Sequence, residues 1–247
     1  MTEIAVLALA GCGTALATGL GAIPVSRLGS HADFLRPALS GLTVGLMTVA
    51  SIVGLLLPAF DEGSTIAIVG GVGVGVLFLL ASRRALKAHD VHVGSLSGAG
   101  VRRSVLVFAV LLVHSLPEGF AIGTAFASDT EGLGLFVILA IALQNVPEGT
   151  SVAIPMNASG FSAGQQFWAA VATSAPQPVG ALLAYVLVEQ IEGLLPFSFG
   201  FAAGAMLALV AFELAPEAFR RGARGRAFAG TLFGAALMLV LAALLGV

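Results

Sequence analysis

The sequence predicts an all-α integral membrane protein with eight transmembrane helices. Of its 247 residues, 58% are hydrophobic and 10% are charged, and the mean hydropathy is +1.03. Soluble domains carry roughly 25% charged residues, so most of this chain must contact lipid or other parts of itself. Apolar segments long enough to cross about 30 Å of hydrocarbon recur along its length. We therefore treat residues 1–247 as a single transmembrane domain.

The eight apolar segments follow one another with short connections. Their approximate bounds are 3–25, 38–60, 64–82, 104–127, 133–157, 161–188, 194–216 and 227–247. The first segment lacks the basic stretch that begins a signal peptide, so we interpret it as a permanent helix. The single cysteine, Cys12, excludes a disulfide within the chain.

Basic residues indicate the orientation of these helices. All 11 fall in connections on one side of the membrane: Arg27, Arg36, Arg83, Arg84, Lys87, Arg102, Arg103, Arg220, Arg221, Arg224 and Arg226. By the positive-inside rule this side is cytoplasmic, so both termini are predicted to be extracytoplasmic. The longest connection, about 83–103, is then a cytoplasmic loop.

The fourth and fifth segments carry a repeated motif, HSLPEG at 114–119 and QNVPEG at 144–149. Each copy has an imidazole or an amide four residues before a glutamate, which puts both groups on one helix face. Pro117 and Pro147 each remove a backbone N–H, so we expect both helices to be kinked.

These motifs put two acids, Glu118 and Glu148, near the middle of apolar helices. A charge at that depth costs between about 2.5 and 17 kcal/mol, so such residues are rare and usually functional. His114 and Gln144 add nitrogen and amide oxygen, which gives a donor set suited to Zn²⁺ and its first-row neighbours rather than to Mg²⁺ or Ca²⁺. We predict an intramembrane metal site of His114, Glu118, Gln144 and Glu148, in which a divalent cation offsets the two negative charges.

The paired motifs resemble those of the ZIP (Zrt/Irt-like) family of divalent-metal transporters. The similarity covers essentially the whole chain, and its other matching stretches are Thr18–Pro24, Gln177–Ala181, Gly204–Met206 and Glu213–Glu217. The same four residues would then form the family's principal transport site.

The resemblance implies transport of a divalent metal into the cytoplasm across the cell membrane. Zinc is the expected ion, with Fe²⁺, Mn²⁺ and Cd²⁺ as alternatives, because their ligand demands overlap. The implied mechanism is alternating access, in which helices 1, 4, 5 and 6 move against helices 2, 3, 7 and 8 as a homodimeric ZIP-like bundle. The metal is cargo, no cofactor is required, and we expect neither enzymatic activity nor a nucleic-acid partner. No Walker A motif is present, so ATP is not the expected driving force.

A neighbouring second site in some family members corresponds to Ser115, Asn145 and Gln177. Here these positions lack the carboxylates of the more acidic versions. We therefore predict one principal ion, with these three residues supporting its ligands or contacting it weakly through water. The alternative is that they only form hydrogen bonds between helices.

Two further groups of residues resemble parts of a cytoplasmic release route. Glu213 and Glu217 lie near the cytoplasmic end of the seventh segment, where the alternative is a solvated interfacial pair beside neighbouring arginines. His89, Asp90 and His92 form a minimal version of a metal-binding loop, and the alternative is an ordinary solvated loop.

Two other classes of protein bury similar residues. An intramembrane metalloenzyme would carry His-Glu-x-x-His on an unbroken helix, and that signature is missing. A proton-conducting protein could keep the glutamates without binding metal. Metal binding that depends on Glu118 and Glu148 separates a transporter from the second alternative.

Overall fold

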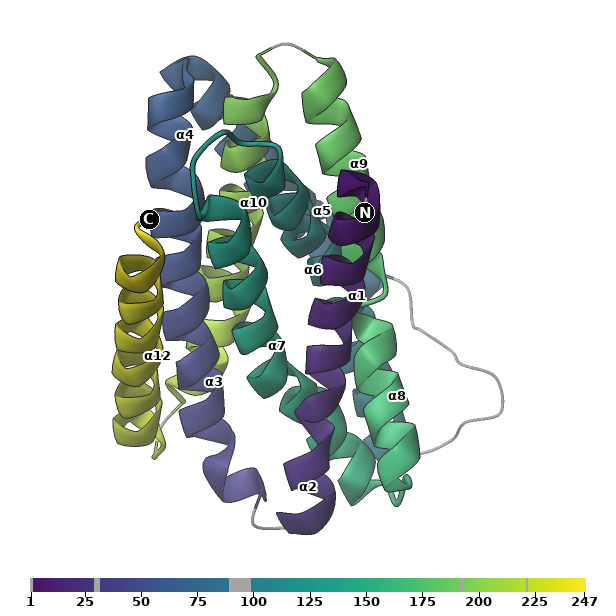
Figure 1. Ribbon diagram of the computed structural model, residues 1–247. Coiled ribbons are helices and arrows are strands. Elements are labelled where there is room, and N and C mark those ends of the chain that lie inside the picture. Colours follow the sequence, from purple (N-terminus) through teal and green to yellow (C-terminus); the bar gives the residue numbers. More distant parts are fainter. Residues whose placement is uncertain (1, 29–31, 89–98, 192, 221) are drawn as a thin grey trace.

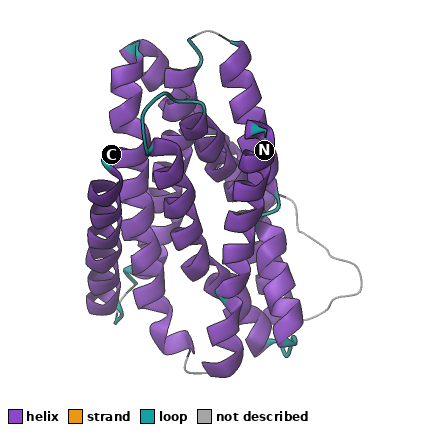
Figure 2. Ribbon diagram, viewed as in Figure 1, coloured by secondary structure: helices purple, strands orange, loops and turns teal. Residues whose placement is uncertain are grey.

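The structure, a computed structural model, describes residues 2–28, 32–88, 99–191, 193–220 and 222–247. These residues form helices joined by short turns, with no strand among them (Figure 2). Eight helical stretches of the described chain are long and apolar enough to cross a membrane: Glu3–Arg27, Phe34–Glu62, Thr65–Leu86, Val107–Phe126, Leu133–Ala158, Ala163–Gln190, Leu195–Ala218 and Arg224–Leu245. The predicted all-helical fold with eight spans is confirmed.

Four of the eight spans are single helices, and the other four are assembled from two or three pieces. The single helices are α5 (Thr65–Ala88), α6 (Ala99–Phe126), α7 (Leu133–Ala158) and α12 (Arg224–Leu245). The first span comprises α1 (Glu3–Leu20) and α2 (Ala22–Leu28), and the sixth comprises α8 (Ala163–Thr173) and α9 (Pro176–Gln190). The second comprises α3 (Ala32–Ser51), η2 (Ile52–Leu56) and α4 (Leu57–Glu62), and the seventh α10 (Leu195–Leu209), η3 (Val210–Leu214) and α11 (Ala215–Ala218).

The η2 and η3 segments are single π-helical stretches, and each lies just before a proline. Pro58 has no N–H for the carbonyl of Gly54, and Pro216 has none for that of Phe212. A π-helical turn shifts the hydrogen bonds by one residue and so accommodates the interruption. Apolar periodicity does not reveal such a turn.

Pro117 and Pro147 lie inside α6 and α7, and both helices remain continuous through their prolines. The sixth span, predicted as one helix over 161–188, is instead divided at Ser174 and Ala175, directly before Pro176. The sequence thus indicated the prolines that interrupt backbone hydrogen bonding. Whether a helix breaks at a proline depends on whether neighbouring helices can supply partners for the freed carbonyl groups.

Basic residues lie within helices more often than the predicted connections allowed. The α5 helix continues to Ala88 and therefore includes Arg83, which the sequence assigned to a loop. The α3 helix begins at Ala32, so Arg36 lies in its first turns rather than before it. Long basic side chains can extend toward water from a helix end, which is why a charge does not mark the end of a span.

Close glycine contacts divide the helices into two groups. The first, which we call the site group, contains α1, α2, α6, α7, α8 and α9. A methyl group at Gly149 of α7 would lie 1.8 Å from the carbonyl oxygen of Thr18 on α1, and one at Gly119 of α6 would lie 2.1 Å from that of Gln177 on α9. Backbones this close admit only glycine, as is typical of membrane helix pairs.

The remaining helices, which we call the flanking group, are α3, η2, α4, α5, α10, η3, α11 and α12. Their close glycine contacts form two pairs, α3 with α12 and α5 with α10. A methyl group at Gly45 of α3 would lie 2.1 Å from the carbonyl oxygen of Thr231 on α12, which Figure 1 shows beside α3. One at Gly75 of α5 would lie 2.1 Å from the carbonyl oxygen of Phe201 on α10.

Between the two groups, the contacts of helical glycines involve side chains only. The described helices place Gly54 of η2 against the ring of Phe136 on α7, not against backbone. Phe120 of α6 meets Phe201 of α10 edge to face, with ring centroids 5.1 Å apart. The site group therefore meets the flanking helices through interdigitated side chains.

Candidate metal-transport site

The two sequence motifs lie side by side in the site group. The α6 helix supplies His114, Ser115 and Glu118, and α7 supplies Gln144, Asn145 and Glu148, with all six residues between 0 and 6% exposed. The spacing of four residues within each motif puts the imidazole or amide above its glutamate on one helix face. As predicted from the sequence, these polar groups are buried within the apolar bundle.

Glu118 is held by two neutral amides. Its Oε1 accepts a hydrogen bond of 3.0 Å from Gln144 Nε2, and its Oε2 accepts one of 2.7 Å from Gln177 Nε2 on α9. Glu118 and Glu148, one on each helix, also interact electrostatically. Both oxygens of Glu118 are therefore fixed by donors from the site group itself.

Asn145 and Gln177 form a second layer beside Glu118. Asn145 Nδ2 lies 3.0 Å from Gln177 Oε1 and donates to the Thr14 carbonyl at 2.7 Å, while Gln177 Nε2 donates to Asn145 Oδ1 at 3.2 Å. Thr14 was not singled out by the sequence, since a backbone carbonyl acts here and the side chain gives no signal. The pair joins α1, α7 and α9 behind the glutamate.

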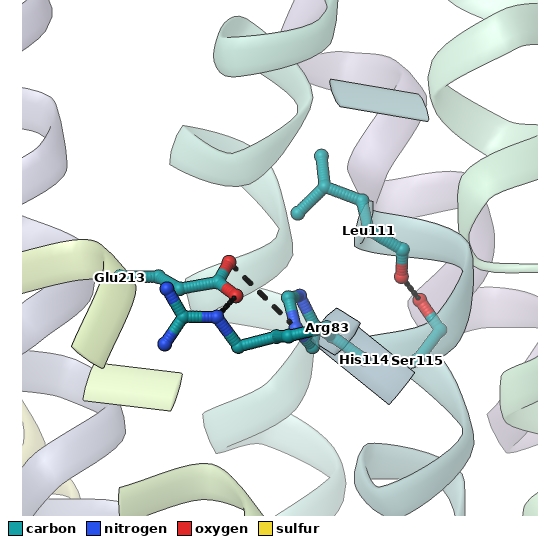
Figure 3. A network of polar contacts seen from close by, with 5 residues as sticks. All are labelled: Arg83, Leu111, His114, Ser115 and Glu213. Carbon is teal, nitrogen blue, oxygen red and sulfur yellow. Dashed lines mark hydrogen bonds and ion pairs between the residues drawn. The ribbon is translucent and has the colours of Figure 1, made fainter. Parts of the chain in front are cut away.

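Ser115 is not brought into this cluster by a side-chain hydrogen bond. Its hydroxyl donates to the Leu111 carbonyl of its own helix at 3.0 Å (Figure 3). Such a bond is the usual way for a buried serine in a membrane helix to satisfy its donor.

Three of the four predicted metal ligands carry a buried polar atom that lacks a hydrogen-bond partner among the described residues: His114 Nδ1, Gln144 Oε1 and Glu148 Oε1. Leaving such an atom unpaired costs about 1–3 kcal/mol, so each one requires an explanation. Imidazole nitrogen, amide oxygen and carboxylate oxygen are all ligands that Zn²⁺ accepts. Their chemistry fits the predicted site.

The ligands are not assembled into a compact acidic cluster. Within the described ranges, no three His, Cys, Asp or Glu side chains lie close enough together to hold a metal ion. His114 Nε2 instead lies 3.8 Å from Oε2 of Glu213. Side-chain movement, or the Gln144 amide as a ligand, is needed to complete a coordination sphere.

A cavity of about 240 Å³ connects the site to one end of the bundle. His114 and Glu148 line it at the site, and Glu213 and Glu217 line it from the seventh span. Arg36, in the first turns of α3, lines the same cavity and marks the end of the bundle toward which it extends. Both helix groups therefore contribute walls to it.

The two carboxylates predicted for a release route each form an ion pair. Arg83 Nε lies 2.7 Å from Glu213 Oε1 (Figure 3), and Arg36 pairs with Glu217. These partners differ from the neighbouring arginines of the alternative interpretation, because α5 and α3 bring distant residues to the seventh span. Sequence reasoning missed Arg83, which no local pattern connects with position 213. His89, Asp90 and His92 lie outside the described residues.

Replacing Gln177 by leucine tests the hydrogen bonds behind Glu118. The variant removes the donor to Glu118 Oε2 and both side-chain bonds to Asn145. Each buried group left unpaired should cost about 1–3 kcal/mol, so we expect a lower melting temperature of the purified protein and weaker zinc binding. Gln190→Leu, at the exposed end of the same helix, is the matched control. Equal melting temperatures for the two variants would contradict this role.

Comparison with known proteins gives a consistent assignment. Residues 79–242 match the family described as ZIP Zinc transporter. The zinc transporter GufA of Myxococcus xanthus is 34% identical over 93% of this chain and 95% of its own length. The zinc transporter ZIPB of Bordetella bronchiseptica is 35% identical over 96% of this chain and 81% of its own length.

A longer protein of Arabidopsis thaliana is 32% identical over 98% of this chain, which spans only 39% of that protein. The family match includes both Pro-Glu-Gly motifs and Glu213. On these matches, and on the eight spans that carry the motifs, the chain belongs to the ZIP zinc transporter family.

Proposed function

We propose that this protein carries Zn²⁺ into the cytoplasm through the site formed by His114, Glu118, Gln144 and Glu148. The observation that supports it best is the set of buried atoms on His114, Gln144 and Glu148 that lack a hydrogen-bond partner among the described residues. Two of these residues, His114 and Glu148, also line the cavity. The named relatives, GufA and ZIPB, are zinc transporters. Fe²⁺, Mn²⁺ and Cd²⁺ remain alternative cargoes, because the same ligands accept them.

In this proposal Glu118 and Glu148 have different tasks. Glu118 is held on both oxygens by amides, so it provides a fixed negative charge. Glu148 and His114 line the cavity and are the groups that an ion meets there. Asn145 and Gln177 keep Glu118 in place, and Ser115 has no direct part in holding the ion.

We further propose alternating access, in which the site group moves against the flanking group. Two features support it. Glycine contacts between backbones join α1, α6, α7 and α9 of the site group into one unit, while helical glycines meet the flanking group through side chains only. The four ligands belong to this unit, and the cavity beside them is lined by both groups. Broken helices near the site, at Gly21 and at 174–175, are typical of transporters with this mechanism.

The direction of transport is proposed from the distribution of basic residues. The positive-inside rule places both termini outside the cell membrane. The cavity then faces the cytoplasm, since it extends to Arg36. A negative interior favours entry by about 2.3 kcal/mol per charge per 100 mV, and by twice that for a divalent ion. The homodimer expected from the family is part of the same proposal.

Proteoliposomes that contain a zinc-sensitive dye test this function. We expect saturable entry of Zn²⁺ that slows as the external pH falls, because protons compete for imidazole and carboxylate ligands. Protein-free vesicles are the control. Entry that never saturates, or its absence at several membrane potentials with correctly inserted protein, would contradict carriage of zinc.

The two alternatives are resolved differently. Membership of a transporter family excludes the intramembrane metalloenzyme and confirms that the chain is not an enzyme. A proton-conducting protein would instead acidify the same vesicles without admitting zinc, so a pH-sensitive dye in a parallel sample separates it from a carrier.

A further inference from the structure

We propose that Arg83 acts as a counter-cation for Glu213, a residue that lines the cavity described above. It forms an ion pair with the carboxylate of Glu213 and so prevents this carboxylate from binding the metal ion that leaves His114 and Glu148. This inference rests on the proposed function and adds a residue that sets how tightly the ion is held and how quickly it is released. Arg83 acts through Glu213 and is therefore a positioning residue, not a ligand.

The ion pair is partly shielded from water and lies within one helix group. Arg83 belongs to α5 and Glu213 to η3, and Arg83 Nε lies 2.7 Å from Glu213 Oε1. Their side chains are only 23% and 18% exposed. Exposed ion pairs contribute little because water and salt screen them, whereas a shielded pair interacts more strongly.

The second oxygen of Glu213 faces the transport site. Oε2 lies 3.8 Å from Nε2 of His114, across the boundary between the flanking group and the site group (Figure 3). Both residues line the cavity together with Glu148. An imidazole and two carboxylates are three ligands of the kind that zinc accepts, and in the described arrangement they stand too far apart to hold an ion together. We infer that, without the ion pair to Arg83, the Glu213 side chain would turn toward His114 and Glu148 and bind the departing ion more tightly.

A carrier must release its ion as well as bind it, so binding has to stay weak enough for the ion to leave. A guanidinium suits this purpose because it remains charged and has no lone pair to offer a metal. It repels the cation and at the same time satisfies the carboxylate. Arg83 thus lowers the affinity of the cavity for the metal ion, while the cavity wall stays polar.

Glu217, the other carboxylate that lines the cavity from the flanking group, also forms an ion pair with an arginine. Glu217 pairs with Arg36 of α3, again within the flanking group. Glu118 differs, because its hydrogen bonds come from the neutral amides of Gln144 and Gln177. The negative charge of Glu118 thus remains available to a metal ion, while the two carboxylates along the exit are neutralised by arginine.

The test compares zinc binding by the purified full-length protein and by Arg83→Gln, using competition with a chromophoric zinc chelator. We expect the variant to bind about tenfold more tightly, which corresponds to about 1.4 kcal/mol. We also expect slower delivery of zinc to a dye inside vesicles. Adding Glu213→Gln to this variant should return both quantities toward wild type, because the trapping carboxylate is gone.

Two further variants keep the test decisive. Arg84→Gln alters the next residue of α5, which is exposed, and should leave binding and delivery unchanged. Glu213→Gln alone leaves the Arg83 charge beside the cavity without its carboxylate and should weaken zinc binding. This second prediction holds even if Arg83→Gln fails to fold.

Unchanged or weaker zinc binding by folded Arg83→Gln would overturn the role of Arg83, as would unchanged binding by Glu213→Gln. A pair that only stabilises the fold would lower the melting temperature without tightening the binding of zinc. These results are distinct from failure of the proposed function, in which the wild-type protein itself neither binds nor transports zinc.

Discussion

Replacing Glu148 by alanine is expected to reduce zinc transport at least about 100-fold. Removing groups that merely support metal ligands already costs about 10–100-fold in affinity or activity, and Glu148 lines the cavity as a proposed ligand in its own right. Its loss leaves a single carboxylate, Glu118, to offset a doubly charged ion. Zinc entry into dye-loaded proteoliposomes measures the effect.

The fold should survive this substitution. Glu148 Oε1 has no hydrogen-bond partner among the described residues, so truncation removes an unpaired buried atom. We therefore expect the melting temperature of Glu148→Ala to equal or exceed that of the wild-type protein. Glu189→Ala, at the exposed end of α9, is the matched control and should transport normally. More than a tenth of wild-type transport in Glu148→Ala would contradict its role as a ligand.

Replacing Gly149 by alanine is expected to destabilise the protein by about 3 kcal/mol or more, at the upper end of the usual cost of overpacking. The added methyl group would lie 1.8 Å from the carbonyl oxygen of Thr18, and backbone cannot move aside as a side chain can. Displacing α1 would also shift the Thr14 carbonyl that holds Asn145. Thermal unfolding in detergent and zinc binding should therefore both be impaired.

Gly13→Ala is the control for this experiment. Gly13 lies on α1, the same helix that Gly149 touches, and a methyl group there meets no atom within 4 Å. Alanine in a helix interior is favoured over glycine by about 0.5–1 kcal/mol, so this variant should be as stable as the wild-type protein or slightly more stable. Similar melting temperatures for the two variants would show that α1 and α7 are not packed as tightly as the structure indicates.

The eight spans and the buried motif residues were predictable because their signals are local. Hydropathy identifies each span, and a spacing of four residues places His114 beside Glu118 whatever surrounds the helix. The resemblance to a family added Gln177, whose hydrogen bond to Glu118 depends on the contact between α6 and α9. Seen in the sequence alone, position 177 is only a polar residue between two prolines.

The features that could not be predicted depend on neighbouring helices. Pro117 and Pro216 have the same covalent effect, yet α6 continues through the first whereas a π-helical stretch precedes the second. The ion pair of Arg83 with Glu213 joins two spans far apart in the sequence. None of these outcomes leaves a periodic pattern in the sequence.

The two kinds of helix contact imply an uneven tolerance to sequence change. A glycine that meets backbone, such as Gly45 against Thr231, allows one register and one residue type. The boundary between the groups uses rings such as Phe120 and Phe201, which other apolar side chains can replace with modest repacking. The boundary can therefore vary in sequence where the glycine contacts cannot. If the proposed movement occurs, substitutions along this boundary should change the rate of transport without changing the proposed ligands.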